Sequence, residues 1–183
     1  MIQRQIRWGV VALVALSLSQ SESLVVSNAP GTAAAWSFSG PPPLPVLSAA
    51  ELERSVQCLA LNIYHEARSE PEQGQRAVAA VTLNRAASGA FPRSICAVVE
   101  QGGKTRHGCQ FSWRCDRRSD RPQESAAWRH ALSLSRQVLS GAIADPTGGA
   151  TYYHADYARP SWSASFEPTA RIGRHIFYRP PPT

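Results

Sequence analysis

Residues 59–70 read LALNIYHEARSE, a pattern that indicates the last turns of a buried helix that carries a carboxylate, Glu66, near its end. Upstream, Ser48 and Glu51 form a Ser-x-x-Glu capping box, which predicts that this helix begins at Ser48. Between these ends, apolar residues recur every three or four positions, as on one face of a helix, at Leu52, Val56, Leu59, Ile63 and Ala67.

Glu66 lies beside this apolar stripe and not opposite it. A carboxylate in that position is partly removed from water, which raises its pKa toward the range that a general acid needs. Arg68 is two residues further on and faces another way, so it need not hold Glu66 ionised as a local ion pair. From spacing alone, a solvated residue near a turn is the simpler interpretation of Glu66.

The chain of 183 residues has room for one domain of about 130 residues with a real core, plus a leader. Its net charge is +6, and 19 residues are Lys or Arg, of which only Lys104 is lysine. This charge suits an anionic partner, which would be a nucleic acid, a membrane surface or an acidic cell-wall polymer. The Arg residues are scattered apart from a cluster at 114–121, which argues against a nucleic-acid-binding surface.

The first residues have the features of an export signal. Arg4 and Arg7 precede an apolar run of about eleven residues, 8–18, which has the length of a signal-peptide core and is too short for an ordinary membrane span. Small-residue cleavage sites occur at Ser27-Asn28-Ala29 and Ala33-Ala34-Ala35, and an uncleaved anchor is an open alternative. We expect a signal peptide or anchor at 1–29, a linker rich in Pro, Ala and Gly at 30–46, a folded domain at 47–179 and a tail at 180–183.

Export gives the cysteines a structural meaning. Cys58, Cys96, Cys109 and Cys115 have no Cys-x-x-Cys spacing, which argues against a structural zinc site. An even number of cysteines in an oxidising compartment predicts two disulfides, with three possible pairings. Cys109 with Cys115 closes a short loop and leaves Cys58 to tie the first helix to the segment around Cys96, and we favour this pairing.

Helical patterns predominate in the rest of the chain. Ser69 and Glu72 form a second Ser-x-x-Glu box, which predicts a helix that starts almost at once and runs to about Arg85. A short apolar element at 95–101, a loop at 102–121 and a third helix at about 122–140 follow, and short strands are expected at 150–155 and 172–178. The predicted fold class is α+β, mostly helical, in one lysozyme-sized domain with a small β part.

Motifs in the right order over residues 59–178 resemble the bacterial cell-wall hydrolase family of the spore cortex-lytic (SleB-like) enzymes. They are Tyr64-His65-Glu66-Ala67-Arg68-x-Glu70, Gly74-Gln75-x-Ala77-Val78-Ala79, Asn84-Arg85, Phe91-Pro92, Cys96, Gln110-Phe111-Ser112, Gly141, Asp145-Pro146-Thr147-x-Gly149-Ala150, Tyr153-His154, Trp162 and Ile172-Gly173-x-His175-x-Phe177. The family's usual Gly after Ala-Arg is Ser69 here, a change that we expect to be harmless.

This resemblance implies cleavage of peptidoglycan glycan strands by a catalytic domain similar to lysozyme and the lytic transglycosylases, without a cofactor. The family's catalytic glutamate maps onto Glu66. Hydrolysis needs a second carboxylate, and the candidates Glu70, Asp116 and Asp156 are weak because they lie in a predicted cap, an Arg-rich loop and a turn. One acid suffices if the 6-hydroxyl of the sugar attacks its own anomeric carbon, so we favour the transglycosylase route over a hydrolytic muramidase or glucosaminidase.

Six residues are candidate substrate-binding residues. Gln110 and Ser112 can hydrogen-bond sugar amides and hydroxyls, and His154 can orient the backbone near the site. Aromatic rings offer a flat apolar face to a sugar, and this role is expected for Phe111, Tyr153 and Trp162. For Trp113 and also for Phe111, packing inside the disulfide loop is the competing interpretation, which we prefer for Trp113.

Three other functions compete with a glycosidase. A zinc amidase would use His65, His154 and His175 as ligands, but Ser69 occupies the second histidine position of a His-Glu-x-x-His motif. A Cys-His peptidase lacks a nucleophile if the cysteines are paired. A non-catalytic wall-binding module would keep the aromatic residues and the basic charge without needing Glu66. We expect a monomeric periplasmic or envelope enzyme whose partner is peptidoglycan and not nucleic acid, with membrane contact only through an uncleaved N-terminal segment.

Overall fold

The computed structural model describes residues 47–103 and 108–181, which belong to one unit of the chain, Gly40–Thr183. The expected leader, its cleavage sites and the linker lie outside the described residues. No helix in the described ranges combines the length and apolarity that crossing a bilayer requires.

Helix α1 (Ala49–Ala67) begins as the capping box predicts. The Ser48 backbone N donates to Glu51 Oε2 at 2.9 Å, and the Glu51 backbone N donates to Ser48 Oγ at 3.3 Å. The apolar stripe starts one turn later than expected, because Leu52 is 45% exposed and Val56 is the first stripe residue in the core. The helix then runs through the centre of the helical part, where Leu59 and Ile63 are fully buried.

The second capping box is absent, which corrects the prediction for the next helix. Helix α2 (Glu72–Ser88) has Pro71 at its N-cap and no side-chain cap hydrogen bond. The Pro71 carbonyl accepts from the backbone N–H groups of Gly74 and Gln75, while the Ser69 side chain is left at the surface. The Pro71 carbonyl satisfies these two donors, so the helix does not need the Ser69 hydroxyl as a cap. The Ser-x-x-Glu spacing was therefore a misleading sign of a capping box at this helix.

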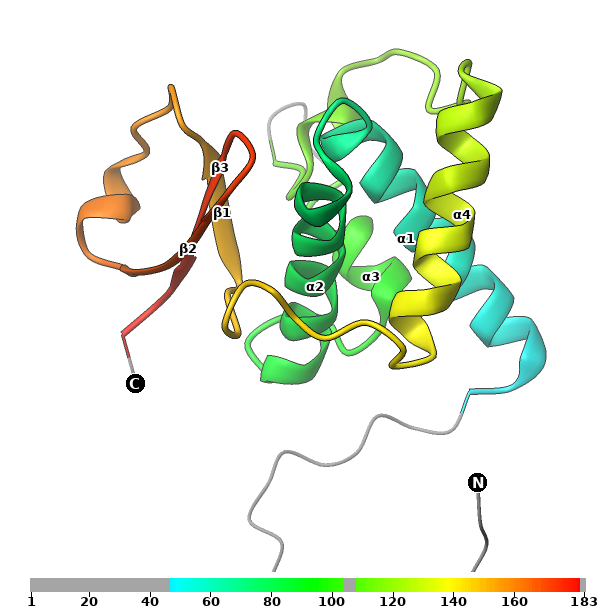
Figure 1. Ribbon diagram of the computed structural model, residues 1–183, viewed down its shortest axis with the longest axis horizontal. Helices are drawn as coiled ribbons and strands as arrows, with labels where there is room; N and C mark the ends of the chain where they lie inside the picture. Colours follow the sequence, from blue (N-terminus) through cyan, green and yellow to red (C-terminus); the bar gives the residue numbers. More distant parts are fainter. Residues whose placement is uncertain (1–46, 104–107, 182–183) are drawn as a thin grey trace, which may run out of the picture. The chain divides into compact units, whose positions relative to one another are not determined.

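Helices α3 (Ile95–Val99) and α4 (Ser125–Leu139) complete the helical part around α1 (Figure 1). The core that these helices share contains Leu59, Ile63, Val98 and Leu134. Disulfide Cys58–Cys96 joins α1 to α3, and disulfide Cys109–Cys115 closes the loop that precedes α4. These are the two pairs that the sequence favours.

The β part is a three-stranded antiparallel sheet of order β1-β3-β2, made of β1 (Tyr152–Ala155), β2 (Glu167–Ile172) and β3 (His175–Arg179). The strand expected at 172–178 corresponds to β3, which begins at His175, whereas β2 was not expected. The two strands form a hairpin that turns at Gly173 and Arg174, and Gly173 has φ +58°, a conformation that favours glycine. The sheet packs on α2 through a second small core of Ala77, Val81, Ala150 and Phe177 (Figure 1). The predicted class, α+β and mostly helical, is confirmed.

Candidate active site

Glu66 lies in the last turn of α1, half-buried, and its carboxylate faces the sheet. The Tyr153 hydroxyl of β1 donates a hydrogen bond to Glu66 Oε2 at 3.0 Å. Burial raises the pKa of Glu66 above its ordinary value, and the Tyr153 hydrogen bond and the positive charge of Arg85 offset part of that rise. A carboxyl group with these surroundings retains its proton to higher pH than a solvated glutamate, as a general acid must.

Tyr153 contacts Glu66 through its hydroxyl, and stacking of its half-buried ring on a sugar stays a prediction. Its ring packs edge-on against His175, with centroids 5.2 Å apart, and lies 5.7 Å from the ring of Phe177. Burial raises the pKa of Tyr153 well above its ordinary value, and the negative charge of Glu66 raises it further. The hydroxyl therefore keeps its proton and acts as the donor to the carboxylate.

Arg85 of α2 is a buried cation beside this pair, and its place in the Asn84-Arg85 motif predicted no role for it. It is 3% exposed, and its Nε donates to the Thr151 carbonyl at 2.7 Å, one residue before β1 begins. Three aromatic rings surround the guanidinium at 5.2–5.8 Å, those of Phe91, Phe111 and Tyr152. The hydrogen bond to Thr151 anchors the start of β1 on α2 and so helps to place Tyr153 against Glu66.

The three carboxylates considered as a second catalytic group are engaged elsewhere. Glu70 Oε2 accepts from the Arg174 backbone N at 2.9 Å, which also corrects its expected role in a helix cap. Asp116 Oδ1 accepts from the Arg118 backbone N at 2.8 Å, and Asp156 lies 3.6 Å from Arg171 Nη2. None of these three shares the hydrogen bond between Tyr153 and Glu66.

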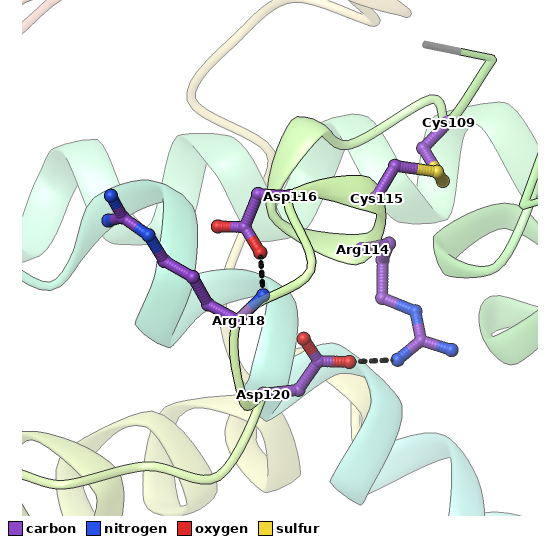
Figure 2. Close-up of a disulfide and its surroundings, with 6 residues drawn as sticks. All are labelled: Cys109, Arg114, Cys115, Asp116, Arg118 and Asp120. Carbon is purple, nitrogen blue, oxygen red and sulfur yellow. Dashed lines mark hydrogen bonds and ion pairs between the residues drawn. A yellow bond between two sulfur atoms is a disulfide. The ribbon is translucent and has the colours of Figure 1, made fainter. Parts of the chain in front are cut away.

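The loop before α4 is fixed by disulfide Cys109–Cys115, an ion pair between Arg114 and Asp120, and the Asp116 hydrogen bond to Arg118 (Figure 2). Its apolar residues face inward. Phe111 is 3% exposed and belongs to the helical core, so its face is not open to a sugar, which corrects the stacking prediction. Trp113 is also buried, as preferred from the sequence, and stacks on His65 at 4.4 Å.

The other polar candidates of this loop remain near the surface. The structure places Gln110 half-buried and Ser112 exposed, on either side of the buried Phe111. Ser112 opens a short 3-10 helix, η1 (Ser112–Cys115). Their side chains are therefore candidates for contacts with a substrate.

His154 and Trp162 have different surroundings although both were expected to bind substrate. His154 is 9% exposed, with Nε2 3.0 Å from the Tyr178 hydroxyl and Nδ1 2.8 Å from the Ala155 carbonyl. Both ring nitrogens are thus satisfied inside the sheet, and His154 is structural. Trp162, on η2 (Ser161–Ala164), is half-buried and packs 5.4 Å from the ring of Tyr152, with part of its surface open.

The histidines that a zinc amidase would require are not gathered in one place. His65 stacks on Trp113, and its Nε2 lies 3.0 Å from the Asp120 carbonyl. Within residues 47–103 and 108–181, no three His, Cys, Asp or Glu residues form a group that could hold a metal ion. The zinc-amidase interpretation therefore has no supporting geometry in this part of the chain.

Comparison with known proteins gives relatives of one kind. The chain is 37% identical over 126 residues to the spore cortex-lytic enzyme of Halalkalibacterium halodurans, a match that covers 68% of this chain and 34% of that protein. It is 35% identical over 125 residues to the spore cortex-lytic enzyme of Bacillus subtilis, covering 67% of this chain and 36% of that protein. The chain thus spans about a third of the length of these curated relatives.

Two solved structures are similar in fold. The catalytic domain of the Bacillus cereus SleB protein matches with a TM-score of 0.54 and 29% identity, covering 77% of this chain and 99% of that domain. The catalytic domain of the germination-specific lytic transglycosylase SleB from Bacillus anthracis matches with a TM-score of 0.51 and 30% identity, covering 74% of this chain and 98% of that domain. The predicted fold, like that of a lytic transglycosylase, is confirmed by these neighbours.

A family model described as Cell Wall Hydrolase matches residues 69–178. The match begins after Glu66, so the role of Glu66 depends on the geometry described above. It includes α2, α3, α4 and most of the sheet, and its length is more than half of the chain. Together with the relatives, this match establishes that the chain belongs to the cell wall hydrolase family.

Proposed function

We propose that this protein is an enzyme that cleaves the glycan strands of peptidoglycan, with Glu66 as its general acid and base. The observation that carries the proposal is the half-buried Glu66 carboxyl with its raised pKa, held by the Tyr153 hydroxyl at 3.0 Å. Family membership supports the substrate class, since the relatives are named spore cortex-lytic enzymes and one structural neighbour is named a lytic transglycosylase.

In the first step, protonated Glu66 gives its proton to the glycosidic oxygen as the bond to the anomeric carbon breaks. Positive charge develops on the sugar ring, and Glu66 becomes a carboxylate. The Tyr153 O–H and the buried Arg85 cation favour that ionised form, because each lowers the pKa of Glu66. Burial favours the protonated form before the step. Because burial raises the pKa of Glu66 while Tyr153 and Arg85 lower it, Glu66 can serve as the acid in one step and as the base in the next.

In the second step, the 6-hydroxyl of the muramic acid attacks its own anomeric carbon, and Glu66 takes the hydroxyl proton. One carbon–oxygen bond is broken and one is formed, no water is consumed, and the product is a 1,6-anhydro end. Hydrolysis would use a second carboxylate to activate water or to form a covalent intermediate. The engagement of Glu70, Asp116 and Asp156 in other contacts favours the transglycosylase route.

Substrate contacts are proposed for Gln110, Ser112 and Trp162, which retain surface. The buried Phe111 and His154 support these residues from inside, and the half-buried Tyr153 holds Glu66 through its hydroxyl. We also propose residues 47–179 as the catalytic domain of an exported, monomeric envelope protein. Two disulfides fit an oxidising compartment, which supports export.

The test is digestion of purified sacculi followed by mass spectrometry of the soluble products. Transglycosylation predicts muropeptides that end in 1,6-anhydro-muramic acid, lighter by one water than hydrolytic products. Reducing ends would refute the route and leave Glu66 as the acid. Release of free stem peptides with intact glycan strands would indicate an amidase and refute the proposed function. Sacculus binding without any soluble product would indicate a wall-binding module.

A further inference from the structure

Glu70 links two turns that are far apart in the sequence. It lies in the turn between α1 and α2, four residues after Glu66, and its Oε2 accepts from the backbone N of Arg174, 104 residues away. Arg174 lies in the turn between β2 and β3. The Arg174 carbonyl in turn accepts from the Asp156 backbone N, directly after β1, at 2.8 Å. A single carboxylate thus connects the end of α1 with the hairpin turn and, through it, with the end of β1.

Two glycines show how closely the backbone approaches Glu70. A Cβ atom on Gly173 would lie 2.0 Å from Glu70 Oε2, and one on Gly74 would lie 3.0 Å from Glu70 Cβ. The first distance is far shorter than any real contact, so the Gly173 turn can reach the carboxylate only because glycine has no side chain. The backbone of α2 at Gly74 and the backbone of the hairpin turn at Gly173 both lie close to the Glu70 side chain. An incidental hydrogen bond at the surface would not require close approach from two sides.

His175, the residue after Arg174, lies between the Glu70 contact and the Tyr153 ring that holds Glu66. His175 begins β3, is 8% exposed, and packs edge-on against the Tyr153 ring that donates to Glu66. Burial lowers the pKa of His175 below its ordinary value, while the charges of Glu70 and Asp156 oppose that shift, so the ring is neutral at neutral pH. A neutral ring packs beside Tyr153 without adding a second cation to the site.

We propose that Glu70 is a positioning residue for the general acid. It fastens the β2–β3 turn to the end of α1 and so keeps His175 and Tyr153 packed against Glu66. The role needs an acceptor oxygen and not a transferable proton. The positioning role rests on the proposed function of Glu66, whereas the contact between Glu70 and the Arg174 amide does not.

The activity test compares two replacements of Glu70. Glu70→Gln keeps an oxygen that can accept from Arg174, so we expect kcat within about tenfold of the wild type, with the pH profile unchanged. Glu70→Met keeps the length and removes the acceptor, so kcat should fall about 10–10²-fold with little change in KM, as for a small displacement of catalytic groups. Glu72→Gln and Glu72→Met are the controls, since Glu72 lies in the same region but pairs only with Arg76 at the surface.

Two outcomes would overturn the proposal. If Glu70→Gln is as inactive as Glu66→Gln and loses a limb of the pH profile, Glu70 is a catalytic carboxylate. If Glu70→Met is as active as the wild type, the contact does not position Glu66.

Hydrogen exchange tests the contact without any substrate. The Arg174 amide should be protected in the wild type and in Glu70→Gln, and should lose protection in Glu70→Met. A Gly173→Ala change adds a second measure, because its Cβ clashes with Glu70, whereas in a Glu70→Ala background the remaining near atom is Pro71 Cδ at an ordinary contact distance of 3.5 Å. The strain of alanine at a positive φ is common to both backgrounds. Gly173→Ala should therefore lower Tm more when Glu70 is present, while equal losses in both backgrounds would refute the contact. If the wild type fails to act on sacculi, the proposed function is wrong, and these two measurements still decide the role of Glu70 in the fold.

Discussion

The hydrogen bond from Tyr153 to Glu66 offers the most direct test of the proposed acid. Tyr153→Phe removes only the hydroxyl and retains the ring that packs on His175 and Phe177. The hydroxyl lowers the pKa of Glu66, so its loss should raise that pKa further. A hydrogen bond to a charged group contributes about 1.5–3 kcal/mol, which is enough for its loss to move the titration of Glu66 measurably to higher pH.

The expected signature is in the pH dependence of kcat/KM, which reports the free enzyme. Glu66 must be protonated to act as an acid, so a higher pKa moves the alkaline limb of the profile to higher pH. The maximum rate should fall about 10–10²-fold, because the carboxylate formed after proton transfer has lost its donor. Tyr157→Phe is the control, since Tyr157 is 77% exposed and makes no contact with Glu66. An alkaline limb that stays in place, or moves to lower pH, would refute the assignment of Glu66 and Tyr153.

Three further predictions concern the site and its support. Glu66→Gln should lower activity on sacculi by at least about 10²-fold. The variant should also be more stable than the wild type in denaturant at neutral pH but not near pH 4, because the pKa of Glu66 is raised in the folded protein and the wild type therefore loses stability as the pH rises through that pKa. Equal stability differences at both pH values would contradict the burial of the charged carboxylate. Removing disulfide Cys58–Cys96, with a separation of 38 residues, should cost about 4 kcal/mol of unfolding free energy, against about 2 kcal/mol for the separation of 6 in the short loop, and non-reducing peptide mapping that found other pairs would refute both values. Phe111→Ala should lower the unfolding free energy by about 3–5 kcal/mol as a core deletion, whereas Trp162→Ala should mainly raise KM; the opposite pattern would return Phe111 to the substrate surface.

Features that depend on neighbouring residues were predicted well. The capping box at Ser48 and the helical period that leads to Glu66 both appear in α1, because a helix start and a buried face are set by residues three or four positions apart. The same reasoning failed where a local competitor was present. Pro71 replaced the Ser69 cap, and the turn at Gly173, with its positive φ, starts the last expected strand at His175, after a strand, β2, that was not predicted.

The sequence by itself determined that Glu66 would end a core helix in a mostly helical domain, and which cysteines could close loops. Only the tertiary structure decided which groups surround the carboxylate. Tyr153 is 87 residues from Glu66 along the chain, and Arg174 is 104 residues from Glu70. Contacts at such separations depend on how the sheet packs against α2, and the spacing of residues in a sequence carries no information on that packing. For the same reason Phe111, in a polar loop, looked available to a sugar until the helical core was seen to enclose it.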